Sequence, residues 1–167
     1  MPEQNTAPLI YPAHFNGWTI NHPLENFKKN NAIEVNPQTM KQLLPTGFYT
    51  IIRRFSSKEE KRRIIARVVR PQDIEGEFIG FENHLNVLHF QKQGLEEEMA
   101  FGLAVYLNST VVDEYFRLFS GHTQVNATDL RLLKYPNRDH LVRLGTWGKE
   151  QTTFSQEEVD KQVAQLL

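Results

Sequence analysis

The apolar and polar positions divide the chain into a β-rich first half and a helical second half. Residues 48–55 (FYTIIRRF) and 64–69 (IIARVV) are rich in aromatic and β-branched side chains, which favour strands. Residues 78–81 and 85–90 have the same character and are separated by a short polar turn. We therefore expect a meander of twisted, mainly antiparallel strands.

The first 47 residues predict short strands joined by loops. They contain six of the eight prolines and many Asn, Gln and Thr residues. Short apolar pieces at residues 9–11 and 17–20 lie between these turn-forming residues.

From residue 96 the apolar period becomes that of an amphipathic helix. Asn108 and Ser109 interrupt the apolar stripe, and Asp113 follows in a position typical of a first helical turn. This pattern predicts two helices that meet at a corner around Asn108. The stripe recurs every four residues and consists of Met99, Leu103, Leu107, Val111, Tyr115 and Phe119.

Capping signals predict two further helical segments. Residues 126–129 (NATD) form a plausible cap before the apolar residues 130–133. Residues 134–136 (KYP) should then be extended, because proline disfavours helix in the residue before it. Ser155 and Glu158 have the spacing of a capping box that opens a last helix.

These elements predict an α+β fold. We expect a twisted, mainly antiparallel β-sheet or partial barrel, followed by an amphipathic helix pair and a C-terminal helix. Residues 1–154 should form one domain, and residues 155–167 should form a helix that packs on it or on a partner. The two halves should share one core, with Leu103, Leu107 and Phe116 buried against the sheet.

The composition is that of a folded domain without cysteine chemistry. The chain has 167 residues, of which 40% are hydrophobic and 11% aromatic, enough to build a core. The absence of cysteine excludes disulfides, thiolate metal sites and a cysteine nucleophile. The sequence contains no apolar run of membrane-spanning length and no signal peptide at its start, so we expect a cytoplasmic protein without a membrane partner.

Positive charge is concentrated in one segment, although the net charge is only −1. Residues 53–70 contain eight basic and two acidic side chains. Such a segment can attract the phosphate backbone of DNA, although a solvated turn is the simpler interpretation. The predicted DNA-backbone residues are Arg53, Arg54, Lys58, Lys61, Arg62, Arg63 and Arg67.

The patterns of known catalytic sites are weak or missing. His84 and His89 would lie on opposite faces of a strand, so they do not predict a metal site. Glu59 and Lys61 match only half of a nuclease pattern, and a triad of Ser120, His122 and Asp129 lacks a nucleophile elbow. Neither the P-loop nor the dinucleotide-binding glycine pattern occurs. We therefore assign no catalytic residue and no metal.

Two polar segments, residues 82–86 and 121–126, have the side chains that read base edges in DNA. Asn and Gln suit adenine, and Ser and Thr can serve several bases. Caps and turns are the alternative explanation for some of these residues. The loop at residues 121–124, before the cap at Asn126, is expected on the DNA side or at a seam with another domain. The candidates are Asn83, His84, Asn86, His122, Thr123, Gln124 and Asn126.

Several motifs, in this order, resemble one known family. They are FSSKEEKRR at 55–63, GFENHLN at 80–86, GLAVYLNS at 102–109, FSGHTQVNATDLR at 119–131 and KYP at 134–136. The match runs from about residue 8 to residue 145. The chain resembles the C-terminal target-recognition region of N6-adenine DNA methyltransferases from type II restriction–modification systems.

The resemblance implies a DNA-reading module rather than a whole enzyme. In that family an N-terminal domain binds S-adenosylmethionine and transfers the methyl group, using an Asn/Asp-Pro-Pro-aromatic motif. Here residues 36–39 (NPQT) lack the second proline and the aromatic residue, and residues 15–17 and 78–80 lack the second glycine of the cofactor motif. We therefore expect no cofactor and no methylation by this chain alone.

The expected partners are double-stranded DNA and the N-terminal methyltransferase catalytic domain. The alternative is a protein-interaction domain that docks a methyltransferase or restriction subunit without reading bases. A small hydrolase or nuclease built on His122 and nearby acids is a distant third.

Overall fold

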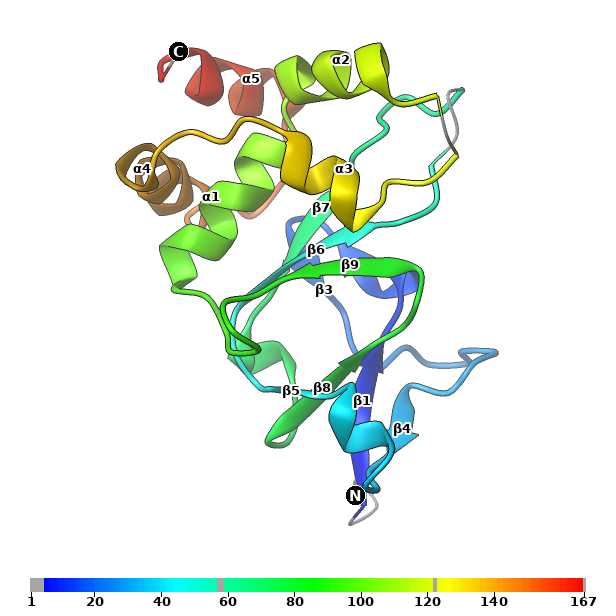
Figure 1. The fold of residues 1–167 in the computed structure, drawn as a ribbon. Coiled ribbons are helices and arrows are strands. Elements are labelled where there is room, and N and C mark those ends of the chain that lie inside the picture. Colours follow the sequence, from blue (N-terminus) through cyan, green and yellow to red (C-terminus); the bar gives the residue numbers. More distant parts are fainter. Residues whose placement is uncertain (1–4, 57–58, 122, 167) are drawn as a thin grey trace.

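The fold is α+β, as predicted; within the residues that the structure describes, five helices gather over one side of small, mostly antiparallel sheets (Figure 1). It is known from a computed structural model, which describes residues 5–56, 59–121 and 123–166. Among these residues no helix has both the length and the apolar character needed to span a membrane.

The strands form two main sheets and a small hairpin. The sheet under the helices has the order β7-β6-β9, and the outer sheet has the order β4-β1-β8-β5. Strands β2 and β3 pair with each other. The strand bounds are β1 Thr6–Ile10, β2 Phe15–Asn16, β3 Thr19–Ile20, β4 Ala32–Glu34, β5 Leu44–Pro45, β6 Tyr49–Arg53, β7 Ala66–Val69, β8 Phe78–Phe81 and β9 Leu85–Leu88. Three single 3-10 turns cover Pro12–His14, Thr39–Lys41 and Pro71–Asp73.

The strand order differs from the expected meander at β8. Strand β9 pairs antiparallel with β6, but β8 lies in the other sheet, parallel to β1 and antiparallel to β5. The turn between β8 and β9 explains the change of sheet. The amide of Glu82 donates to the carbonyl of Ile10 in β1, and the amide of Leu85 then donates to the carbonyl of Glu82. The chain thus leaves one sheet and enters the other within three residues.

The predicted helix corner at Asn108 is confirmed. The Ser109 hydroxyl accepts a hydrogen bond from the amide of Val112, which makes Ser109 the N-cap of the second helix. The caps at Asn126 and Ser155 are also confirmed, whereas α4 was not predicted. The helix bounds are α1 Glu97–Leu107, α2 Thr110–Phe119, α3 Ala127–Leu132, α4 Arg138–Gly148 and α5 Gln156–Ala164.

Helix α4 packs unusually close to α1 through glycine. A Cβ atom added to Gly145 would lie 1.6 Å from the carbonyl oxygen of Glu98, and one added to Gly102 would lie 1.9 Å from that of Leu141. Only residues without a side chain allow the two backbones to approach this closely.

The helices and the inner sheet share one core, as expected. Leu107 and Phe116 are fully buried in it together with Ile52 of β6, while Leu103 is half-buried at its border. A second cluster, which includes Ile10, Tyr49, Ile51 and Ile79, fills the space between the two sheets. The predicted β and helical halves are therefore joined by packing and not only by the chain.

The apolar stripe does not stay buried beyond the corner. On α2 the buried apolar residues are Val112 and Phe116, because the extended backbone at Ser109 (φ −73°, ψ 151°) interrupts the helical period between the two helices. A contiguous outer face is left exposed, which consists of Val111, Tyr115, Leu118 and Phe119. We call it the α2 outer face; Leu118, at 84% exposure, is its most exposed member.

Asn108 ties the corner to the free edge of β7. Its side-chain oxygen accepts from the amide of Ala66 at 3.0 Å, and its side-chain nitrogen donates to the carbonyl of Ala66 at 2.8 Å. The amide of Val68, two residues along the same edge, donates to the carbonyl of Trp18. The edge of β7 is thus occupied by a side chain and by a loop carbonyl.

Candidate nucleic-acid interface

Three loops that are distant in sequence meet at one side of the inner sheet (Figure 1). They are the β6–β7 connection, the β8–β9 turn and the loop between α2 and α3. Arg54 lies at their centre: its amide donates to the carbonyl of His84 at 2.8 Å, and its carbonyl accepts from the amide of Val125 at 2.6 Å. The amide of Ser56 donates to the carbonyl of Thr123 at 2.8 Å. We call this arrangement the loop cluster.

The loop cluster extends the sheet beyond β6. Phe55 and Gln124 form an antiparallel bridge, so the α2–α3 loop lies beside the chain where β7 has already diverged. Backbone hydrogen bonds of this kind hold loops in a fixed register, and rigidly supported loops are a common place for binding residues. The two polar segments predicted to read bases are therefore brought together.

Some candidates face outward from the loop cluster. Asn83, His84 and Thr123 are exposed, and Gln124 is half-buried. The His84 ring lies 4.8 Å from the Phe55 ring, and its Nδ1 lies 2.5 Å from the Glu82 carboxylate. Within the described residues the side-chain amide of Gln124 has no hydrogen-bond partner.

Other candidates anchor the loops. The Asn86 amide donates to the carbonyl of Val125 at 2.7 Å, which fastens the α2–α3 loop to β9. Asn126 is the N-cap of α3, and its backbone amide donates to the Asp129 carboxylate at 2.9 Å. The structure gives both residues a clear structural role. His122 and Lys58 lie outside the described residues.

The basic segment is not a row of exposed side chains. Lys61 is exposed and Arg54 is half-buried, and Arg54 reaches the carbonyl of Asn83 at 3.4 Å. Arg53 forms an ion pair with Glu60. The Arg67 guanidinium donates to the carbonyl of Ala66 and lies between the rings of Phe15 and Phe154. Among these basic residues, Lys61 and Arg54 therefore remain the candidates for phosphate contacts, because their side chains are at least partly exposed.

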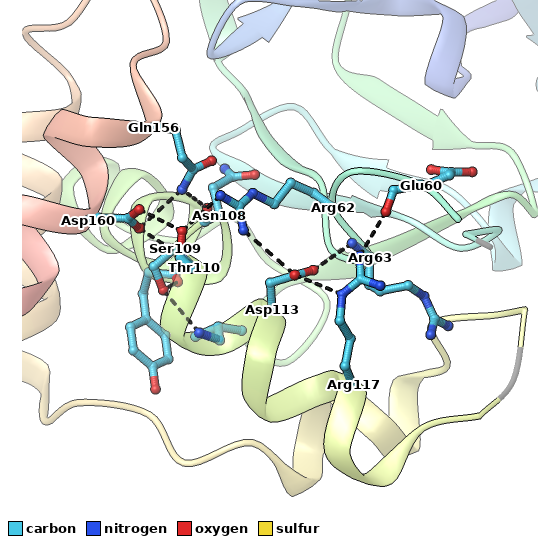
Figure 2. A network of polar contacts seen from close by, with 12 residues as sticks. Glu60, Arg62, Arg63, Asn108, Ser109, Thr110, Asp113, Arg117, Gln156 and Asp160 are labelled. Carbon is cyan, nitrogen blue, oxygen red and sulfur yellow. Dashed lines mark hydrogen bonds and ion pairs between the residues drawn. The ribbon is translucent and has the colours of Figure 1, made fainter. Parts of the chain in front are cut away.

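Arg62 and Arg63 belong to a polar network around Asp113 of α2, drawn in Figure 2. The Asp113 carboxylate accepts from the backbone amide of Arg63 at 2.7 Å and from Nε of Arg117 at 2.9 Å. Nη1 of Arg62 lies 3.6 Å from the same carboxylate. We call this arrangement the Asp113 network.

Arg63 is 1% exposed, which contradicts the expectation that its side chain faces a DNA backbone. Its guanidinium donates to the Ser56 hydroxyl at 3.1 Å and stacks over the Phe116 ring at 5.1 Å. Burial lowers the pKa of this guanidinium, and the positive charge of Arg117 lowers that pKa further, whereas Asp113 raises it. Since arginine nevertheless remains charged in proteins, Arg63 depends on its buried partners.

The Asp113 network continues to the C-terminal helix. Nη2 of Arg62 donates to the Thr110 hydroxyl, and the Thr110 hydroxyl and amide donate to the Asp160 carboxylate at 2.6 and 2.7 Å. Burial alone would raise the pKa of Asp160, but these hydrogen bonds lower it overall. The basic segment is therefore fastened to both α2 and α5 (Figure 2).

The described part of the chain contains no group of three or more His, Asp or Glu side chains able to hold a metal ion. The loop cluster presents amides, a hydroxyl, an imidazole and cations instead. These are groups that donate and accept hydrogen bonds, as base edges and phosphates require.

Comparison with known proteins gives two relatives that match almost the whole chain. It is 52% identical over 168 residues to the type II methyltransferase M.BsuBI of Bacillus subtilis, and 42% identical over 166 residues to the type II methyltransferase M.PstI of Providencia stuartii. The chain is related to type II methyltransferases. It spans only about a third of each relative, 33% and 32% of their lengths. No family model matches, and no solved structure matches.

Proposed function

We propose that this chain is the part of an adenine-specific type II DNA methyltransferase that recognises the DNA sequence. The similarity to M.BsuBI and M.PstI over the whole chain, yet over only a third of each relative, carries the proposal. The loop cluster supports it, because three loops joined by backbone hydrogen bonds offer candidate base-reading side chains on one side of the fold. Methyl transfer and binding of S-adenosylmethionine would belong to the remaining two thirds of such an enzyme.

The proposed contacts divide into two kinds. Gln124, Thr123, Asn83 and His84 would read base edges, since their side chains carry both donors and acceptors. Lys61 and Arg54 would bind phosphates beside them, which orients the module without adding sequence information. Asn86 and Asn126 would hold the reading loop in place.

Gln124→Ala is expected to weaken binding to the cognate site by about 1 to 3 kcal/mol and binding to random DNA by much less. The amide would lose a bidentate contact with one base, while phosphate contacts would remain. The measurement is fluorescence anisotropy, after the preferred site has been selected from a pool of random duplexes. Gln93→Ala, an exposed glutamine after β9, is the matched control. Equal losses of affinity for the cognate site and for random DNA would mean that Gln124 contacts the DNA backbone and not a base.

Lys61→Gln is expected to weaken binding to all duplexes alike. It should reduce the slope of log affinity against log salt by about 0.9, the value for one phosphate contact. Titrations over a range of salt concentrations give this slope. Lys161→Gln, which removes an exposed lysine from α5, should leave it unchanged. A slope equal to that of the parent would place Lys61 in solvent and away from the DNA.

The α2 outer face favours a second contact, with the catalytic part of the enzyme. Its four apolar side chains are contiguous, with the Tyr115 and Phe119 rings 5.3 Å apart. Leu118→Asp is therefore expected to abolish methyl transfer when this chain is mixed with the part of M.BsuBI outside the matched residues. Glu114→Gln, which replaces an exposed charged side chain on the same helix by an uncharged one, should preserve methyl transfer. Unimpaired transfer with Leu118→Asp would exclude this face from the contact.

A further inference from the structure

Beside the loop cluster lies a hollow of about 310 Å³ lined by four aromatic rings. Phe55 and His84 come from the loop cluster, while Tyr11 and Phe27 come from the first part of the chain. Lys29, Arg53 and Glu82 line the same space. We call it the aromatic hollow.

The rings of the aromatic hollow form two pairs. Phe55 and His84 are 4.8 Å apart between ring centres, and Tyr11 and Phe27 are 5.3 Å apart in an edge-to-face arrangement. Phe55 remains 43% exposed, so this large apolar ring is not buried in the protein core. An exposed aromatic ring next to polar, base-reading candidates indicates a binding surface for another flat ring.

Charge in the aromatic hollow suits an anionic ligand with a flat ring. The ammonium group of Lys29 lies 5.3 Å from the centre of the Tyr11 ring, and within the described residues Lys29 forms no ion pair. The Glu82 carboxylate is held by the amide and ring of His84. Burial and, second, the charge of Glu82 raise the pKa of Tyr11, so its hydroxyl stays a neutral hydrogen-bond donor.

We propose that the aromatic hollow binds one unstacked nucleobase of the DNA that the loop cluster contacts. This proposal rests on the proposed function. A base inside a duplex has both faces covered by its neighbours, so only a base outside the stack can place a face against Phe55. Stacking on aromatic rings accepts every base, and the Lys29 ammonium would bind the phosphate attached to that base.

The test compares two short duplexes that differ by one unpaired thymine, each titrated with the full chain and followed by fluorescence anisotropy. The duplex with the unpaired base should bind about tenfold more tightly, the effect expected for one stacked base. Phe55→Ala and, separately, Phe27→Leu should abolish this preference. Phe90→Ala, which removes an exposed phenylalanine outside the hollow, should retain it. Circular dichroism establishes that each variant is folded.

The outcomes separate the two proposals. Tight binding of the paired duplex with no preference for the unpaired base overturns the aromatic hollow and leaves DNA recognition intact. A preference that survives both Phe55→Ala and Phe27→Leu also overturns the hollow, because the base then binds elsewhere. Binding to neither duplex overturns the proposed function and the hollow together.

Discussion

Asp113→Ala is expected to destabilise the protein by about 1 to 3 kcal/mol, the usual cost of leaving a buried hydrogen-bond donor without its acceptor. The change leaves the backbone amide of Arg63 buried without its acceptor and removes the carboxylate that faces three arginines. Burial lowers the pKa of Arg63 and so disfavours its positive charge, whereas Asp113 raises that pKa. The substitution removes this compensation. Urea denaturation followed by circular dichroism measures the loss.

Glu114→Ala is the matched control for Asp113→Ala. Glu114 is the next residue on α2 and is exposed, so its removal should change stability by less than about 0.5 kcal/mol. If Asp113→Ala cost no more than this control, the Asp113 network would not hold the basic segment. Because of this network, charge reversal at Arg63 would damage the fold. A substitution at Lys61, without a change at Arg63, is therefore the variant that tests contact with the DNA backbone.

Leu107→Ala is expected to cost about 2 to 5 kcal/mol. Leu107 is fully buried at the end of α1, where helix and sheet residues share one core. Truncation would remove apolar contacts and leave a cavity that a packed core fills only in part. Urea denaturation followed by circular dichroism measures this loss of stability.

Leu118→Ala provides the contrast on the neighbouring helix. With 84% of its surface exposed, Leu118 contributes little to the core of the isolated chain, and its loss should be within about 0.5 kcal/mol. Similar losses at Leu107 and Leu118 would mean that α1 does not pack on the sheet as the structure shows.

Local signals predicted the elements that the chain defines by itself. The strand at β6, the corner at Asn108 and the caps at Asn126 and Ser155 all depend on residues close together in sequence. Helix α4 escaped prediction because its buried residues include glycines, and Gly145 acts by letting α1 approach rather than through an apolar side chain. Similarly, the exclusion of Val111 from the core depends on the angle at the corner, which periodicity does not contain.

The candidate site shows the same division. Residues 82–86 and 121–126 were predicted as polar recognition segments, but their meeting at Arg54 depends on backbone hydrogen bonds between distant strands and loops. The burial of Arg63 was not predictable from its own segment. Its partner Asp113 lies fifty residues away and has the local signature of an ordinary first-turn helix residue. Phe55 was predicted as the end of a strand and the start of a family motif, but not as part of a binding surface.

The contact between Asn108 and β7 has a consequence for how the protein behaves at high concentration. A strand at the border of a sheet offers unpaired amides and carbonyls to any other extended chain, and this is a common route to aggregation. In β7 the Asn108 carboxamide imitates a neighbouring strand at Ala66, and the Trp18 carbonyl occupies the amide of Val68. The helix corner thus protects the sheet from pairing with a second molecule, and loss of the Asn108 amide would expose a template for intermolecular β-structure.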